Sequence, residues 1–188
     1  MKKEFLDLGR HPIANAFLNK NQFENEFFFD LKVCWDDENK LVSIKEFVEP
    51  SKIFNVKYPY NTSNSVPMIE HFHETARLLK KEFQPKSVLE IGSNAGEFIV
   101  NFPKETSMCV EPCDNFAEIT GDKGDRTRTE FWTTELSNKI LDDLDGKVEL
   151  IYAANCICHI HDLQDTFNGI NNILDDDGVF IFEDPSLL

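Results

Sequence analysis

Long hydrophobic stretches are missing from this sequence of 188 residues. The longest apolar runs, at 151–158 and 179–182, have the length of strands and fall short of the ~18 residues that a membrane-spanning helix needs. The first residues, Met1-Lys2-Lys3-Glu4-Phe5, start with basic side chains, but no apolar segment follows them as it would in a secretory signal. We therefore expect a cytoplasmic protein that has no membrane partner.

Positive charge is scarce as well. The chain has 19 Lys and Arg against 34 Asp and Glu, which gives a formal net charge of −15. Nucleic acids and anionic membrane surfaces are both bound through basic faces, and no basic cluster is visible in the sequence. We therefore expect no nucleic-acid partner. The hydrophobic content of 41% is typical of a globular chain rather than a disordered one.

Cysteine is present, but without the pattern of a disulfide framework. The five cysteines stand at positions 34, 109, 113, 156 and 158, an odd count with no disulfide-like spacing. Such usage is typical of reduced thiols in a cytoplasmic protein, most of them serving as small core residues.

The pattern of the sequence changes near residue 65. Residues 1–64 are irregular, and only 27–34 and 41–44 have the character of strands, separated by a polar turn at 36–39. This arrangement predicts a β-hairpin. The segment has too few apolar residues to predict a large core of its own.

Residues 65–188 alternate regularly between predicted strands and helices. The first helix is expected to begin at Ser65 as its N-cap, with Pro67 in the first turn and Pro85 at its end. Strands are then predicted at 87–91, 107–110, 126–131, 148–153 and 179–182, and helices at 95–102, at 115–120, from Thr134 to 144, and after Asp162. Such alternation predicts an α/β fold, a Rossmann-like parallel sheet covered by helices.

A glycine-containing turn follows the first predicted strand. Glu90-Ile91-Gly92-Ser93-Asn94-Ala95-Gly96 places two glycines where a tight turn lets the backbone approach a ligand closely. Glu111, which stands before Pro112 at the end of the second strand, follows Gly92 at about the 20-residue spacing of an acidic side chain that binds ribose hydroxyls. Ligands of such sheets bind at the carboxyl ends of the strands. These features predict an adenosine-containing cofactor.

The turn favours S-adenosylmethionine over a dinucleotide. In the G-x-G-x-x-G pattern of dinucleotide sites, Asn94 here replaces the second glycine and Glu97 the third, and Glu97 would bring negative charge towards the phosphates. The sulfonium and ammonium groups of S-adenosylmethionine, in contrast, suit the carboxylate of Glu90. NAD, FAD and a purely structural turn remain the alternatives.

Six segments carry a resemblance to a known family. They are 8–18, 58–65, 90–96, 110–112, 154–162 and 178–185. In these segments the sequence resembles the C-methyltransferases that act on nucleotide-linked keto-deoxysugars of the dTDP type. The resemblance covers essentially the whole chain, and it is most specific at Pro12-Ile13-Ala14-Asn15 and Tyr58-Pro59-Tyr60. It implies S-adenosylmethionine as the cofactor and a nucleotide-linked sugar as the substrate.

The resemblance also implies roles for individual residues. C-methylation needs a base that removes a proton next to the keto group, and His159, after the fourth strand, is the candidate for this base or for a donor to the enolate. Its neighbour His161 could be confused with it, and Tyr60 is the candidate hydroxyl donor to the substrate oxygen. The candidate cofactor contacts are Glu90, Gly92, Ser93, Asn94, Gly96, Glu111, Pro112, Phe131 and Asn155.

The chain departs from the family pattern in three places. Family members usually carry an N-terminal zinc module with two C-x-x-C pairs, but Cys34-Trp35-Asp36-Asp37 keeps one cysteine, so we predict no metal. Ala95 stands where the family often has Asp. The sequence reaches Leu188 soon after the fifth strand, whereas the family continues with further strands and a C-terminal domain. An uncovered sheet edge and face would favour self-association.

These observations leave three hypotheses for the function. The first is methyl transfer from S-adenosylmethionine to a carbon of a nucleotide-linked keto-sugar, through an enolate formed by a His base. The second is a truncated, non-catalytic module that binds the cofactor. The third is a methyltransferase that acts on an oxygen or nitrogen of another small metabolite.

Overall fold

The computed structural model describes residues 2–185. It consists of two compact units, Met1–Tyr60 and Asn61–Leu188. The sequence suggested a boundary between 64 and 65, whereas the contacts place residues 61–64 with the second unit. The cause is a set of hydrogen bonds from Thr62 and Ser63 to side chains of that unit.

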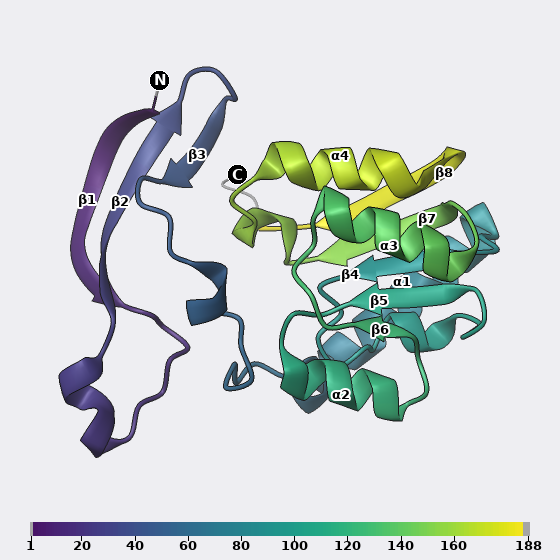
Figure 1. Cartoon of the computed structure of the whole chain (residues 1–188), viewed down its shortest axis with the longest axis horizontal. Helices are drawn as coiled ribbons and strands as arrows, with labels where there is room; N and C mark the ends of the chain where they lie inside the picture. The colour runs from purple at the N-terminus through teal and green to yellow at the C-terminus, as the bar shows by residue number, and fades with distance from the viewer. Residues whose placement is uncertain (1, 186–188) are drawn as a thin grey trace. The chain divides into compact units, whose positions relative to one another are not determined.

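The first unit contains a three-stranded antiparallel sheet in the order β1-β2-β3 (Figure 1). Its elements are β1 (Lys2–Pro12), a 3₁₀ helix (Lys20–Asn25), β2 (Phe28–Asp36), β3 (Leu41–Ile44) and a second 3₁₀ helix (Pro50–Lys52). The predicted hairpin is confirmed as β2 and β3. Strand β1 was not predicted, because two shifts in register interrupt its pairing and every residue in it is exposed, so the sequence shows no period of two.

The second unit begins with a 3₁₀ turn (Thr62–Asn64) and the long helix α1 (Val66–Phe83). Ser65 holds the N-cap position, although its side chain makes no capping hydrogen bond, and Pro67 stands in the first turn. Gln84 adopts a left-handed conformation with φ 49° and ends the helix immediately before Pro85. The buried face of α1 is apolar, as the spacing predicted.

Five parallel strands form the central sheet in the order β6-β5-β4-β7-β8. They are β4 (Val88–Ile91), β5 (Ser107–Val110), β6 (Thr127–Arg128), β7 (Val148–Ala154) and β8 (Leu174–Glu183). The chain moves outwards from β4 to β6 and then returns to β7, so the strand order reverses between β4 and β7. This reversal is the position at which α/β sheets bind ligands, and the predicted Rossmann-like fold class is confirmed.

Helices cover both faces of the sheet (Figure 1). One apolar cluster packs α3 (Thr134–Leu144) and α4 (Leu163–Ile173) against β4, β5 and β7. The other packs α1 and the segment around Phe98 against the opposite face. Helix α2 (Asp114–Asp122) follows β5, and short 3₁₀ helices follow β4 (Ile99–Asn101) and β7 (Ile157–His159). No helix in the described part of the chain is both long and apolar enough to span a membrane.

Several details of the predicted elements were wrong. Residues 95–102 form turns and one 3₁₀ turn instead of a helix, because Gly96 has φ 78° and the amide of Ile99 is taken by the carboxylate of Glu90. The predicted burial of Phe98, Ile99 and Phe102 is nevertheless correct. The strand predicted at 126–131 contains only two residues, since the chain leaves the sheet to enter α3. That helix is capped by Thr133 and not by Thr134, whereas Asp162 caps α4 as predicted.

Strand β8 lies at an edge of the described sheet, paired with β7 alone. The side chain of Phe182 on this strand is 52% exposed and stacks on Phe180, with ring centroids 5.3 Å apart. Self-association through this edge stays a prediction.

Candidate functional site

The loop that follows β4 needs both of its glycines. Gly92 has φ 74°, and a Cβ atom there would lie 2.8 Å from the sulfur of Cys156, in the segment after β7. Gly96 has φ 78°, and its Cβ would lie 2.7 Å from a side-chain carbon of Thr120 on α2. Asn94, between them, also adopts a left-handed conformation, with φ 48°. The loop is therefore packed closely against two neighbouring segments at the carboxyl edge of the sheet.

Glu111 stands at the end of β5 and reaches across to this loop. One of its carboxylate oxygens accepts a hydrogen bond from the amide of Asn94 at 2.7 Å, and the other accepts one from the amide of Cys113 at 2.8 Å. Burial raises the pKa of Glu111, while these two hydrogen bonds act in the opposite direction. The side chain of Cys113 is a third hydrogen-bond partner. An ionised carboxylate has about four acceptor sites, so Glu111 retains the capacity to accept a hydrogen bond from a ribose hydroxyl.

Glu90 is a second buried carboxylate at the same edge, 3% exposed. It accepts a hydrogen bond from the amide of Ile99 at 3.0 Å. Burial raises its pKa well above the usual range, and the nearby acidic side chains of Glu111, Asp125 and Glu97 act in the same direction. A buried carboxyl among other acids is stabilised in its ionised form by a bound cation. The two carboxylates, as hydrogen-bond acceptors and negative charges, therefore fit a ligand that carries both ribose hydroxyls and positive charge.

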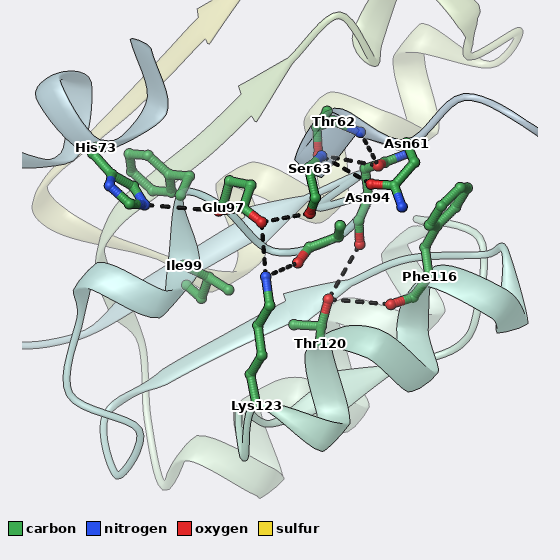
Figure 2. Close-up of polar contacts among 12 residues, drawn as sticks. Asn61, Thr62, Ser63, His73, Asn94, Glu97, Ile99, Phe116, Thr120 and Lys123 are labelled. Atoms are coloured by element: carbon green, nitrogen blue, oxygen red, sulfur yellow. Dashed lines mark hydrogen bonds and ion pairs between the residues drawn. The ribbon is translucent and has the colours of Figure 1, made fainter. Parts of the chain in front are cut away.

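The carboxylate of Glu97 is paired within the protein, whereas the sequence suggested that it would bring negative charge towards the ligand. Its carboxylate accepts hydrogen bonds from the ammonium of Lys123 at 2.8 Å and from the hydroxyl of Ser63 at 2.6 Å (Figure 2). Although burial acts to raise the pKa of Glu97, these two partners lower it overall. The side chain is thus an ionised anchor within the protein, and its charge is compensated by Lys123.

The candidate residues after β7 lie at the same carboxyl edge. Asn155 is exposed and has φ 51°, and its amide donates to the carbonyl oxygen of Glu183 at 2.6 Å. His159 is exposed at the end of the 3₁₀ turn that follows. Burial raises the pKa of the Cys156 thiol, which packs against Gly92, to about 12, so this cysteine is a neutral wall residue.

Three further candidate residues belong to the second unit. Ser93 is buried in the loop, Pro112 follows Glu111 after β5, and Phe131 is 40% exposed in the segment after β6. Tyr60 is 49% exposed and is the last residue of the first unit. The roles of all these residues remain predictions.

Sequence reasoning missed the residues that hold the loop from outside. Thr62, Ser63, Thr120 and Lys123 all donate hydrogen bonds to residues between 94 and 97. No spacing rule links positions so far apart in the chain. One signal was available, an asparagine between two turn glycines. Asn tolerates the left-handed region, and its side-chain amide can hydrogen-bond to other segments of the chain.

Comparison with known families agrees with this geometry. A family described as a methyltransferase domain matches residues 69–187, and a family described as a putative zinc binding domain matches residues 1–54. The chain belongs to the methyltransferase-domain family, whose cofactor is S-adenosylmethionine. The expectation of this cofactor rather than a dinucleotide is confirmed.

Individual relatives are more distant. The C-methyltransferase NovU of Streptomyces niveus is 27% identical over 98% of this chain, which spans 45% of that protein's length. Among solved structures, a SAM-dependent methyltransferase from Thiobacillus denitrificans in complex with S-adenosyl-L-homocysteine is 14% identical, with a TM-score of 0.46 over 58% of this chain and 47% of the other. A possible histamine N-methyltransferase from Thermotoga maritima is 20% identical, with a TM-score of 0.44 over 64% and 56%. The family assignment does not rest on these two structures.

The first unit does not have the ligands of a zinc site. Within residues 2–185 no three His, Cys, Asp or Glu side chains come together as a metal ion would require. Cys34 is buried, and the two carboxylate oxygens of Asp36 accept hydrogen bonds from the amide of Glu38 and the side chain of Asn39. One thiol beside an occupied carboxylate does not make a tetrahedral site.

Proposed function

We propose that this chain catalyses the transfer of a methyl group from S-adenosylmethionine to a carbon of a nucleotide-linked keto-sugar. The observation that carries this proposal is the extent of the similarity to a C-methyltransferase, which covers 98% of the chain and so includes the first unit as well as the methyltransferase domain. The specific segments 12–15 and 58–60, which resemble the sugar C-methyltransferases, lie in that first unit.

The buried carboxylates suit the two ends of the cofactor. In this proposal Glu111 accepts a hydrogen bond from a ribose hydroxyl, and Glu90 faces the positive charge of the bound molecule. When bound, S-adenosylmethionine supplies a methyl group on a positively charged sulfur atom. The positive φ of Gly92 and Gly96, together with the absence of a Cβ at both, lets the turn pack against Cys156 and Thr120 and so fixes the shape of the proposed cofactor loop.

His159 is the proposed base. A keto group acidifies the neighbouring C–H bond, and an imidazole suits the removal of that proton because its ordinary pKa is close to neutral pH. The proton passes to the imidazole of His159, and the electron pair left on carbon is shared with the keto oxygen. This carbon then forms a bond to the methyl group as the bond from methyl to sulfur breaks, with S-adenosylhomocysteine as the leaving group. Tyr60 is the proposed hydroxyl donor to that oxygen, while Phe131 and Asn155 form walls of the cofactor pocket.

The experiment that tests this proposal is solvent exchange in D₂O without the cofactor. The chain is incubated with a dTDP-linked keto-deoxysugar, and deuterium at the carbon beside the keto group is followed by NMR. We expect exchange with the wild-type chain and its loss in His159→Gln, with His161→Gln as the matched control that keeps exchange.

Two other outcomes would contradict the proposal in different ways. Methyl transfer to a small-molecule acceptor without any C–H exchange would favour an O- or N-methyltransferase. A folded chain that binds the cofactor but shows neither exchange nor methyl transfer would favour a non-catalytic module.

A further inference from the structure

The short turn before α1 is fastened to the cofactor loop at two points. The first is Thr62, whose amide and hydroxyl both donate to the side-chain oxygen of Asn94, at 2.9 and 3.1 Å (Figure 2). Thr62 is 6% exposed, so this interaction is shielded from water. Asn94 is the left-handed residue between the two turn glycines, and its own amide binds Glu111. Asn94 therefore links the turn, through its side chain, to Glu111, through its backbone amide, and Glu111 is the residue that we assign to the ribose.

The second point is Ser63, whose hydroxyl donates to Glu97 at 2.6 Å. The same carboxylate oxygen accepts from Lys123, which also donates to the carbonyl oxygen of Ala95 at 2.7 Å. The side chain of Glu97 is 10% exposed. The turn itself is shaped by Asn61, which accepts a hydrogen bond from the amide of Ser63 at 2.8 Å. Loop, turn and the end of α2 thus form one hydrogen-bonded network.

A loop with this composition needs external support. Gly92, Asn94 and Gly96 all have positive φ, and glycines are the residues that lose most conformational freedom when they are ordered. Any interaction that orders the loop before the ligand arrives removes that loss from the cost of binding. Hydrogen bonds from Thr62 and Ser63 order the loop through the side chains of Asn94 and Glu97 and not through its backbone.

We propose that Thr62 and Ser63 form a latch on the cofactor loop that sets its affinity for S-adenosylmethionine, with Asn94 and Glu97 as the positioning residues that receive it. The inference rests on the assignment of this loop to the cofactor. Coupling between two binding events is reciprocal. Closure of the latch therefore tightens cofactor binding, and a bound cofactor stabilises the closed latch.

The test changes only the latch and leaves the loop intact. Thr62→Val/Ser63→Ala removes both hydroxyl donors, whereas Thr62→Ser/Ser63→Thr keeps them and is the matched control. By calorimetric titration with S-adenosylmethionine, we expect the first variant to bind about tenfold more weakly, as the loss of two hydrogen bonds predicts, and the control to stay within about twofold of the wild type. Equal affinity of all three folded proteins would overturn the latch.

A second pair of measurements separates positioning from simple structural support. Asn94→Gly keeps a residue that favours positive φ but removes the acceptor of Thr62, and it too should weaken binding about tenfold without loss of the folded state. In the wild type, addition of the cofactor should slow hydrogen exchange at the amide of Thr62, and it should not do so in Asn94→Gly. Exchange at Thr62 that is indifferent to the cofactor would overturn the coupling. A wild-type chain that binds no cofactor would overturn the site assignment and the latch together.

Discussion

The carboxylate of Glu111 and the backbone amide of Asn94 are joined by a hydrogen bond of 2.7 Å. One residue ends β5 and the other belongs to the turn after β4, so this bond ties together the ends of two neighbouring strands. It also fixes the carboxylate beside a backbone turn that only residues tolerant of positive φ can form. The chemistry proposed for this protein depends on that arrangement.

Gly92→Ala should destabilise the second unit strongly. The new Cβ would meet the sulfur of Cys156 at 2.8 Å, and the residue would also be strained at φ 74°. Backbone strain of ~1–2 kcal/mol and overpacking of ~1–3 kcal/mol together predict a loss of about 2–5 kcal/mol in the free energy of unfolding. Gly121→Ala on α2 is the control, because φ there is not positive and nothing lies within 4 Å of the new atom. Denaturant unfolding would contradict the prediction if both variants lost the same amount.

Glu97 should make stability depend on pH at the acidic end. Burial acts to raise the pKa of Glu97, but the hydrogen bonds from Lys123 and Ser63 have the larger effect. The pKa in the folded protein is therefore below the ordinary value of 4.5. The stabilising contribution of Glu97 is complete above that value and is lost as pH falls through the lowered folded value. Glu97→Gln should flatten the dependence of Tm on pH in this range, while Glu118→Gln, at an exposed position on α2, should leave it unchanged. A curve for Glu97→Gln that parallels the wild type would refute this role.

For Glu90 we expect the opposite dependence of stability on pH. Burial raises its pKa well above the usual range, so its contribution to stability is present at low pH and is lost as pH rises through the folded value. Glu90→Gln, which keeps an oxygen for the amide of Ile99, should raise Tm at pH 8, and the gain should shrink towards pH 5. The same variant should weaken cofactor binding, because in the proposed site it removes a negative charge that stabilises the cationic ligand. A variant that is less stable at pH 8, or that binds as the wild type does, contradicts this assignment.

The edge at β8 should mediate self-association. Phe182 is 52% exposed next to Phe180 on a strand that pairs on one side only, within the part of the chain that the structure describes. The net charge of −15 opposes association of two copies, so we expect a dimer that becomes stronger with added salt in sedimentation velocity. Phe182→Glu should abolish it, whereas Leu78→Glu, at an exposed apolar position on α1, should not. Loss of the dimer in both variants would place the interface elsewhere.

The sequence predicted the fold through patterns that are local. Apolar strands such as 148–153 and the amphipathic spacing of α1 follow from burial on one or two faces, and both features appear in the structure. The turn from Gly92 to Gly96 was equally visible, because glycine marks positive φ. Residues 95–102 were misjudged because their apolar spacing is that of a helix, while the tertiary bond from Ile99 to Glu90 decides the backbone.

The supports of the site could not be predicted in the same way. The contact between Thr62 and Asn94 joins positions with no common period, and it depends on where α1 begins relative to the sheet. Lys123 has the same character, since nothing in the sequence indicates which of its fifteen lysines neutralises Glu97. Such contacts are set by tertiary packing rather than by any pattern along the chain.

The most direct test of this account is a calorimetric titration of the chain with S-adenosylmethionine and with S-adenosylhomocysteine. Glu111→Ala serves as the comparison, with near-UV circular dichroism to verify that it is folded. We predict saturable binding of both ligands by the wild-type chain and its loss in the folded variant, since the acceptor for the ribose hydroxyls is gone. A folded wild-type chain that binds neither ligand, or a variant that binds as tightly as the wild type, would contradict the central claim.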